Sequence, residues 1–488
     1  MLTPAEELGL SGLALAGRVR KAFDTIPEPT LIELLGRVRA EADRRHLIYL
    51  RDGQREVIHI LPLPLTVLPD QLAYIHWASL TILGALKRLP ELYAQDPAVR
   101  AALLLAPEEE AWFLACGGAS PRDDDPVFGR LDAVIDYTSP MWKDSLRFLE
   151  PNLSGVGGLH LIPTCEGIVA DVVVPALRSR DDQLHLEVGQ DVRALLMQEI
   201  LDHLQALGRP ARNVCFLEPK YAGSGPDEQE ELARYYHERH GLTILHADPA
   251  ELTLRDGEVC YGDDAVELAY RDYEVRDLIA LEHDGVDVEP MRTLFRQNRI
   301  ISSITAELDQ KSCWEVLTDP QLAQRHFRAD ERQVFRRHVL WTRLLAERRV
   351  VLPDGRAGEL LEYARREHET LVLKPNRSCG GAGVVLGSAL GRAEWEAALE
   401  HALADDQRWV VQRLASLPVR EFPVLGPDGS VHVEPFYTVM GFAPSQNGLA
   451  ILGRASQKQV VNVAQRGGMC AVMVGRPPAR LLGPGPHP

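Results

Sequence analysis

Apolar residues recur at three- and four-residue spacing through much of the first part of the chain. The pattern is clearest over residues 29–46 and 70–89, where it predicts amphipathic helices. We therefore interpret residues 1–116 as a helical N-terminal region. The stretch 117–126 is rich in glycine, proline and aspartate and has the composition of a loop.

Strand-like and helix-like segments alternate between residues 168 and 300. Short apolar runs at 213–219, 242–248 and 266–274 are separated by longer segments with helical spacing. This alternation predicts a parallel sheet covered by helices. No GxGxxG motif opens any of these helices, so the pattern does not indicate a dinucleotide site.

The pattern becomes mixed from residue 301 to residue 475. We expect a helix that carries Lys311, followed by helical structure to about residue 348. A strand at 370–375 then leads into a glycine-containing loop, and another strand follows at 409–414. The last residues, 476–488, are rich in proline and glycine, which predicts a disordered tail.

Charge and cysteine usage narrow the function classes. The formal net charge is -17, and an acidic chain is a poor candidate for nucleic-acid binding, which depends on Lys and Arg. The seven cysteines form no CxxC pair, and the first residues lack the pattern of a signal peptide. Prolines, Asp70 and two histidines interrupt the most apolar stretch, residues 59–86, which we interpret as buried protein. We expect a cytoplasmic protein with no nucleic-acid or membrane partner.

Two short motifs on strand-like runs bring oxygen ligands together. Residues two apart on a strand share a face, so Arg130 and Asp132 can lie together, as can Glu150 and Asn152. If the two strands pair, two carboxylates and an amide oxygen converge, and such hard ligands suit Mg²⁺. The alternative is a surface salt bridge with an Asx-turn that opens the following glycine-rich segment.

A second motif combines a lysine with a glycine-rich loop. Lys374 ends a strand-like run, and the loop behind it contains Gly380, Gly381 and Gly383, whose N–H groups can approach phosphate oxygens. Only seven of the 53 basic residues are lysine, so a lysine within a motif is more informative than usual. The alternative is a hairpin turn with a lysine that reaches solvent.

Three further pieces are weak when taken singly. Lys311 lies near a predicted helix start, and Gln412 ends the strand-like run at 409–414. Arg454 and Ser456 would share one face of a strand a few residues before Asn462. An arginine there can neutralise charge on a transferring phosphoryl group. Taken alone, each of these residues is better explained as an ordinary surface or core position.

In this order, over about residues 120–475, the motifs resemble the circularly permuted ATP-grasp ligases, and in particular the synthetase part of glutathionylspermidine synthase. The chain departs from that family at LSGVGG, which replaces an Asp-Thr-Pro-like segment, and at Ala382, where relatives often have a charged residue. The resemblance implies an α/β (α+β), circularly permuted ATP-grasp fold. Its expected parts are a helical N-terminal region (1–116), a metal-binding part of the core (117–167), a Rossmann-like pre-ATP-grasp domain (168–300), the nucleotide-binding lobes (301–475) and the tail (476–488).

The resemblance also implies a reaction. In that family ATP phosphorylates a carboxylate and an amine attacks the acyl phosphate, so we expect ATP and Mg²⁺ as cofactors, with a small-molecule carboxylate and amine as substrates. Alternatives are a non-catalytic binding or scaffold protein and a small-molecule kinase on the same fold. A homodimer is the default expectation. The implied roles are Mg²⁺ binding for Asp132, Glu150 and Asn152, phosphate contact for Lys311, Lys374, Gly380, Gly381 and Gly383, the adenine pocket for Gln412, and charge stabilisation for Arg130 and Arg454.

Overall fold

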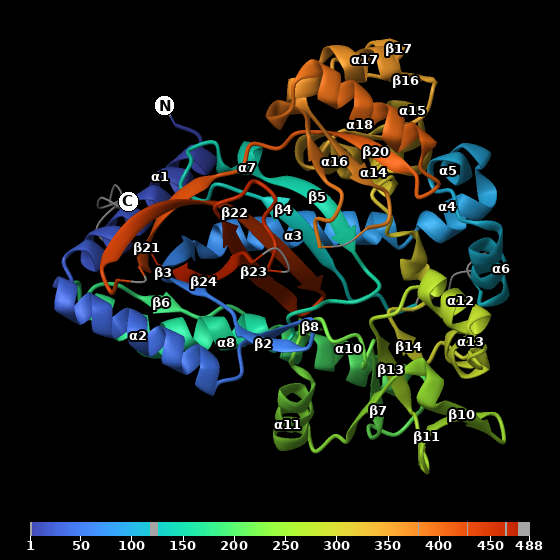
Figure 1. The fold of residues 1–488 in the computed structure, drawn as a ribbon, viewed down its shortest axis with the longest axis horizontal. Coiled ribbons are helices and arrows are strands. Elements are labelled where there is room, and N and C mark those ends of the chain that lie inside the picture. Colours follow the sequence, from blue (N-terminus) through green and yellow to red (C-terminus); the bar gives the residue numbers. More distant parts are fainter. Residues whose placement is uncertain (1, 118–124, 379, 427, 464–465, 477–488) are drawn as a thin grey trace, which may run out of the picture.

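The computed structural model describes residues 2–117, 125–378, 380–426, 428–463 and 466–476 (Figure 1). The predicted tail lies outside the described residues from 477 onward, as does most of the predicted loop at 117–126. No helix within the described ranges is both long and apolar enough to cross a membrane.

One large mixed sheet occupies the left and centre of Figure 1. Strands from both ends of the chain lie side by side in it, since β3 and β24 pair in parallel. The N-terminal region is therefore part of this sheet. In spatial order the strands are β3 (Ile60–Val67), β24 (Gly468–Gly475), β23 (Gly448–Ser456), β22 (Val431–Ser445), β4 (Arg130–Val134) and β5 (Arg147–Asn152), with β21 (Val419–Leu425) paired to β22 and β6 (Leu186–Glu187) to β24.

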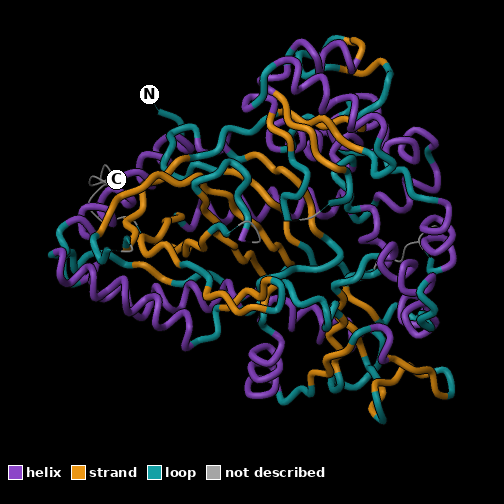
Figure 2. Tube along the Cα trace, in the orientation of Figure 1, coloured by secondary structure: helices purple, strands orange, loops and turns teal. Residues whose placement is uncertain are grey.

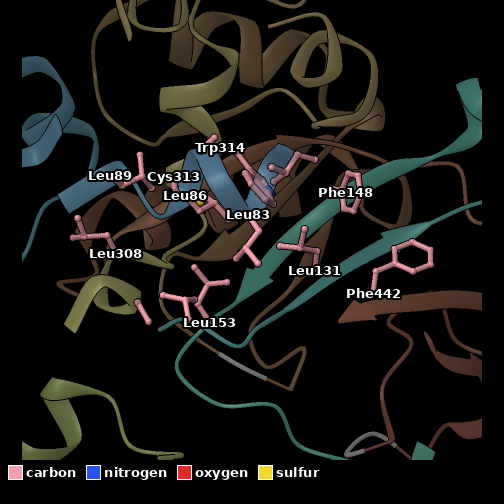
Figure 3. Packing of buried hydrophobic residues seen from close by; sticks show 14 of the residues in the cluster. Leu83, Leu86, Leu89, Leu131, Phe148, Leu153, Leu308, Cys313, Trp314 and Phe442 are labelled. Atoms are coloured by element: carbon pink, nitrogen blue, oxygen red, sulfur yellow. The ribbon is translucent and has the colours of Figure 1, made fainter. Parts of the chain in front are cut away.

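Apolar clusters lie on both faces of the large sheet. On one face, α3 (Pro69–Leu86) contributes Leu83 and Leu86 to the cluster that contains Leu131 of β4 and Phe148 of β5 (Figure 3). On the other face, α1 (Pro4–Asp24), α2 (Glu28–Arg44) and α8 (Leu161–Ile168) pack against β3, β23 and β24. Helices accordingly run along the outside of the strands in Figure 2.

The N-terminal region corrects one expectation. Helices α2 and α3 form where helical spacing predicted them, but residues 48–67 form strands β1 (Ile48–Arg51), β2 (Gln54–Val57) and β3. Asp52 and Gly53 both have positive φ, as a tight two-residue hairpin turn between β1 and β2 requires. Pro62 and Pro64 are tolerated in β3 because it is the edge strand.

The alternating segment forms the predicted parallel sheet. Its strand order is β14-β13-β7-β9, and every neighbouring pair is parallel. A small antiparallel meander, which the pattern did not predict, follows β9. The elements are β7 (Val214–Leu217), β9 (Ile244–Ala247), β13 (Leu268–Arg271), β14 (Ile300–Ile301), α10 (Val192–Ala206), α11 (Gln229–His240), α12 (Val275–His283), α13 (Glu289–Arg296), β10 (Leu252–Arg255), β11 (Glu258–Tyr261) and β12 (Asp264–Ala265).

A third, antiparallel sheet forms a separate lobe at the top right of Figure 1. Lys311 lies in a turn just before α14 and not on a helix, and the expected helical run ends at His338, before β15. The elements are β15 (Thr342–Leu344), β20 (Trp409–Arg413), β18 (Leu371–Pro375), β19 (Val385–Leu386), α14 (Cys313–Thr318), α15 (Pro320–His326), α16 (Ala329–His338), β16 (Arg349–Val351), β17 (Ala357–Glu359), α17 (Leu360–Arg366) and α18 (Arg392–Ala404).

Short helices join these larger parts. Several begin at sequence signals for a helix start, as when Asp96 caps α5 through a bond from the Ala98 N–H (2.8 Å). The short helices are α4 (Leu89–Gln95), α5 (Pro97–Ala102), α6 (Pro107–Ala115), α7 (Trp142–Ser145) and α9 (Val174–Arg178), and the two-residue strand β8 (Gly225–Pro226) pairs with β1.

Candidate active site

A cavity of about 380 Å³ lies between the large sheet and the smaller antiparallel sheet. Its walls come from β4, β5, β18, β20, β22 and β23 and from the turn before α14, so segments more than 300 residues apart meet there. It brings together most of the residues that the sequence singled out. Those that line it are Asp132, Glu150, Lys311, Lys374, Gly381, Gln412, Arg454 and Asn462.

Strands β4 and β5 pair as the sequence analysis required. They run antiparallel, with Arg130 opposite Asn152 and Asp132 opposite Glu150. Both carboxylates line the cavity, whereas Arg130 and Asn152 are not among the described lining residues. Asn152 instead lies with its Nδ2 3.5 Å from the Arg130 carbonyl oxygen.

Asp132 is a buried carboxylate between two guanidinium groups. Its Oδ1 accepts a hydrogen bond from Arg130 Nε at 2.9 Å and lies 2.9 Å from Arg454 Nη2. Burial alone would raise the pKa of Asp132, but the charges of Arg130 and Arg454 outweigh it and hold the pKa below its usual value. Asp132 is therefore ionised at neutral pH.

Arg454 has hydrogen-bonding capacity left over. Its side chain is 4% exposed, and its Nε makes no hydrogen bond to any described residue. A buried guanidinium donor without an acceptor is costly unless a ligand supplies the acceptor. The position of Arg454 on the cavity wall therefore fits an anionic ligand.

Two lysines share one carboxylate at the cavity wall. Glu150 Oε2 lies 3.6 Å from Lys311 Nζ and 3.8 Å from Lys374 Nζ. Lys311 also donates to the carbonyl oxygen of Ser378 at 2.5 Å. Burial lowers the pKa of Lys374, and the Lys311 charge adds to this shift, while Glu150 opposes it. Two ammonium groups against one carboxylate leave positive charge for phosphate oxygens.

Asn376 fixes the spacing between the two lysines. It follows β18, and its carbonyl oxygen accepts a bond from the Lys311 N–H at 3.0 Å. Its Oδ1 accepts from the Ser312 N–H at 2.8 Å, and its Nδ2 donates to Gln310 Oε1 at 2.7 Å. These bonds fasten the turn that carries Lys311 to the strand that carries Lys374.

The glycine loop has the backbone that its composition suggested. Gly380, Gly381 and Gly383 all have positive φ, between 69° and 76°. A Cβ on Gly381 would come within 2.6 Å of Val460 Cγ1, so this glycine allows the loop to approach the segment after β23. Gly381 alone of the three lines the cavity.

Gln412 joins the two sheets across the cavity. It is buried, and its Nε2 donates to the Leu149 carbonyl oxygen and to Thr342 Oγ1, each at 2.9 Å. Both amide hydrogens are therefore used within the protein. The predicted contact with adenine stays a prediction, and it is restricted to Gln412 Oε1 and the aliphatic part of the side chain.

The sequence analysis missed the apolar walls of the cavity. These residues suit a flat, largely apolar ring, and such walls are typical of ligand pockets. The alternation of side chains along β22 would have identified Tyr437 and Val439 once the cavity-facing side of that strand was known. The apolar lining includes Leu149, Val372, Val384, Leu386, Leu414, Leu417, Tyr437, Val439 and Val461.

Arg130 links the cavity wall to the glycine-rich segment after β5. Besides its bond to Asp132, it donates from Nη1 to the Gly157 carbonyl oxygen at 3.1 Å. Gly441 of β22 lies against it: a Cβ there would come within 2.5 Å of Arg130 Cδ. The sequence analysis did not single out Gly441, because this contact depends on a strand that is distant in the chain.

The carboxylates fit a magnesium ion that is shared with phosphates. The described residues contain no group of three or more His, Cys, Asp or Glu able to hold a metal ion. Asp132 and Glu150, however, are opposite each other on β4 and β5 and both line the cavity. Mg²⁺ in nucleotide sites is commonly bound by one or two carboxylates together with phosphate oxygens. The donor set therefore fits Mg²⁺ in the presence of a nucleotide.

Comparison with known proteins identifies the fold. No protein-family model and no curated protein matches the sequence. Among solved structures, the chain is similar to a glutathione synthetase-like effector of Globodera pallida in its apo form, with 10% identity and a TM-score of 0.61, over 92% of this chain and 98% of that chain. The chain therefore shares the fold of a glutathione synthetase-like protein.

Two further solved structures align over about half of the chain. A RimK-domain ATP-grasp protein of Sphaerobacter thermophilus aligns with 14% identity and a TM-score of 0.25, over 52% of this chain and 97% of that chain. D-alanyl-alanine synthetase A of Vibrio cholerae aligns with 9% identity and a TM-score of 0.26, over 55% of this chain and 89% of that chain. These scores are too low to carry an argument. The mixed α/β architecture agrees with the expected α/β fold class, while the ATP-grasp type and the circular permutation stay predictions.

Proposed function

We propose that the chain is an ATP-dependent carboxylate–amine ligase. The observation that carries this proposal is the cavity wall on which Lys311, Lys374 and Arg454 converge with Asp132 and Glu150. Phosphoryl transfer requires positioning and charge neutralisation rather than covalent help from the protein. Three cations and two carboxylates beside an apolar slot supply those requirements.

Each group has a distinct role in the proposal. Lys311 and Lys374 contact the phosphates, and the apolar slot takes the base. Asp132 and Glu150 would hold Mg²⁺, which would supply charge neutralisation on the phosphate oxygens. Arg454, which lines the cavity with its Nε unsatisfied, would neutralise the charge that develops on the transferred phosphoryl group.

The proposed reaction has two steps. A substrate carboxylate oxygen attacks the terminal phosphorus of ATP, which forms an acyl phosphate and releases ADP. The nitrogen of a neutral amine then attacks the acyl carbon, the C–O bond to phosphate breaks, and the amine gives up a proton. The products are an amide, ADP and phosphate. Arg130, on the side of Asp132 that faces the glycine-rich segment, would stabilise the oxyanion of the second step.

Calorimetry with ATP, with and without Mg²⁺, tests the nucleotide site. We expect the wild type to bind ATP in an Mg²⁺-dependent manner. Lys374→Met removes a buried charge at similar volume, and Glu150→Gln removes one of the two carboxylates. Each should weaken binding at least about tenfold, because hydrogen bonds to charged groups contribute about 1.5–3 kcal/mol. Lys220→Met is the matched control, because Lys220 pairs with Glu251 outside the cavity.

ADP release then separates the ligase from its alternatives. A screen of acid and amine pairs should give ADP release that requires both substrates. Release with a single substrate and no amine would indicate a small-molecule kinase. Absence of ATP binding in the wild type would contradict the ligase and favour a non-catalytic binding protein.

A further inference from the structure

A second and larger cavity, of about 830 Å³, lies on the N-terminal side of the large sheet. It is enclosed by α2, the segment from β2 into β3, and the hairpin of β21 and β22, and none of its lining residues also lines the active-site cavity. Its volume is within the range of about 300–1,000 Å³ that is typical of small-molecule sites. The lining residues are Leu35, Val38, Arg39, Arg55, Glu56, Val57, Ile58, His59, Ile60, Pro62, Pro423, Val424, Leu425, Gly426 and Arg466.

The interior of this cavity is apolar, and so is part of its mouth. Val38, Ile58 and Ile60 are at most 5% exposed and belong to the cluster between α2 and the sheet. Val57 and Leu425, by contrast, are each 38% exposed although both are large apolar residues. An apolar lining that remains open to solvent favours a ligand with an apolar body.

The charges around the cavity are mainly positive. Arg39, Arg55 and Arg466 line it together with one acidic residue, Glu56, in a chain whose net charge is -17. Glu56 lies 3.4 Å from Arg466 and 2.9 Å from Arg51, so its charge is shared between these two arginines.

Of the other two arginines, Arg55 pairs with the exposed Asp43 at 3.3 Å, whereas Arg39 has no ion pair to any described residue. Burial lowers the pKa of His59, the Arg39 charge adds to this shift and Glu434 opposes it, and Arg39 and His59 both line the cavity. An anionic group at the mouth would find Arg39 available.

We propose that this cavity binds a small organic anion: an apolar aromatic or aliphatic body in the interior, with its carboxylate or sulfonate beside Arg39. The site is separate from the proposed ligase chemistry. It also gives a binding role to α2 and β3, which supply no residue to the active-site cavity.

Two fluorescent probes of matched shape test the proposal. 8-Anilinonaphthalene-1-sulfonate has an aromatic body and a sulfonate, and N-phenyl-1-naphthylamine has the same body without charge. We expect saturable binding of both to the wild type. Val57→Trp and Leu425→Trp narrow the mouth and should each weaken both probes at least about tenfold. Val188→Trp is the control, because Val188 is an exposed valine (48%) outside the cavity.

A charge reversal tests the anion preference separately. Arg39→Glu should weaken the sulfonate probe about tenfold, equivalent to about 1.4 kcal/mol, and should change the neutral probe less than about twofold. Arg37→Glu makes the same change on the same helix outside the cavity and should leave both probes unaffected.

Four results would overturn the proposal: no saturable probe binding, equal effects of both mouth variants and Val188→Trp, equal effects of Arg39→Glu and Arg37→Glu, or displacement of the sulfonate probe by Mg²⁺-ATP. Displacement would place the probe in the active-site cavity. ATP calorimetry on the same variants should be unchanged, so failure here is distinguishable from failure of the ligase proposal.

Discussion

The charges of the candidate site converge on Asp132. One carboxylate is shared by two guanidinium groups, so the group as a whole keeps a positive charge inside the protein. Such a group is stable only if further interactions compensate it. In the proposed function an anionic substrate beside Arg454 would provide that compensation, which would connect the buried arginine to the proposed chemistry rather than to stability.

Gly441 gives a test of the role of Arg130. In Gly441→Ala the new Cβ would lie 2.5 Å from Arg130 Cδ, so the arginine side chain must move away from Asp132 and Gly157. We expect ATP affinity within about twofold of the wild type, because Arg130 does not line the cavity. Turnover of an acid and amine pair should fall at least about tenfold, since a displaced Arg130 guanidinium would stabilise the oxyanion of the second step less well.

Gly36→Ala is the matched control for this variant. Gly36 is exposed within α2, and a Cβ there meets nothing within 4 Å. Turnover measured by ADP release should be unchanged in this control. Unchanged turnover in Gly441→Ala as well would show that Arg130 has no part in the reaction.

Individual site residues differ in how far the sequence could predict them. Lys374 was identifiable because lysine is scarce in this chain and a glycine loop follows it. Asp132 and Glu150 were identifiable from two-residue spacing on strands that proved to pair. Gly441 and the hydrogen bonds of Gln412 were not, because their partners become neighbours only when distant segments fold together.

At the scale of elements, hydrophobic periodicity predicted those helices and strands whose formation depends mainly on the local sequence. Helices α2 and α3 and the parallel strands β7, β9 and β13 formed where the spacing indicated. Strand β3 was missed because Pro62 and Pro64 argue against a central strand, and its edge position depends on pairing with β24 about 400 residues later. The end of the helical run before β15 was missed for a similar reason, since β15 is stabilised by pairing with β20.

Asp96 connects α5 to α15, and it gives a prediction about how the stability of the fold depends on pH. It caps α5 and accepts hydrogen bonds from Arg325 (2.5 Å) and His326 (2.7 Å) of α15. Burial raises the pKa of Asp96, but the bonds from His326, the Ala98 N–H and Arg325 outweigh it and lower the pKa to about 2. Because the pKa of Asp96 is lower in the folded chain than in the unfolded chain, the ionised carboxylate stabilises the fold at pH values above about 4, its pKa in the unfolded chain. This stabilisation is lost as the pH falls toward 2.

Asp96→Asn keeps the helix cap but loses the charge, because asparagine also caps well. Its free energy of unfolding in urea should be lower than that of the wild type by about 1–2 kcal/mol at pH 6. The difference should narrow as the pH falls from about 4 toward 2. Asp52→Asn, at an exposed turn, is the control and should show no such difference. A gap that does not depend on pH would exclude the charge of Asp96 as its cause.

At the scale of the molecule, partly buried ion pairs connect the parts. Arg377 begins the glycine loop, and its guanidinium contacts Glu109 of α6 and lies 3.4 Å from Glu274 at the start of α12. One side chain thus connects the N-terminal region, the parallel sheet and the antiparallel lobe that contains β18. The three side chains are only 12–25% exposed, so water screens their charges less than at the surface. The ion pairs can therefore help to orient the three parts around the candidate active-site cavity.

The N-terminal region is expected to fold with the rest of the chain and not as an independent module. Strand β3 covers the edge of β24 in parallel register, and α1 and α2 bury apolar residues against the same sheet.

Deletion of residues 1–68 would expose Met469, Cys470 and Val472, all now at most 2% exposed, and would leave an apolar strand edge without a partner. We therefore expect the shortened chain to lose cooperative thermal unfolding in circular dichroism and to lose ATP binding, even though every cavity-lining residue is retained. Co-expression with a fragment of residues 1–68 should restore both properties, since the missing strand and helices can pair from a separate chain. A shortened chain that unfolds cooperatively and binds ATP without the fragment would instead make the N-terminal region a separable domain, and would confine the proposed ATP-binding unit to the residues after it.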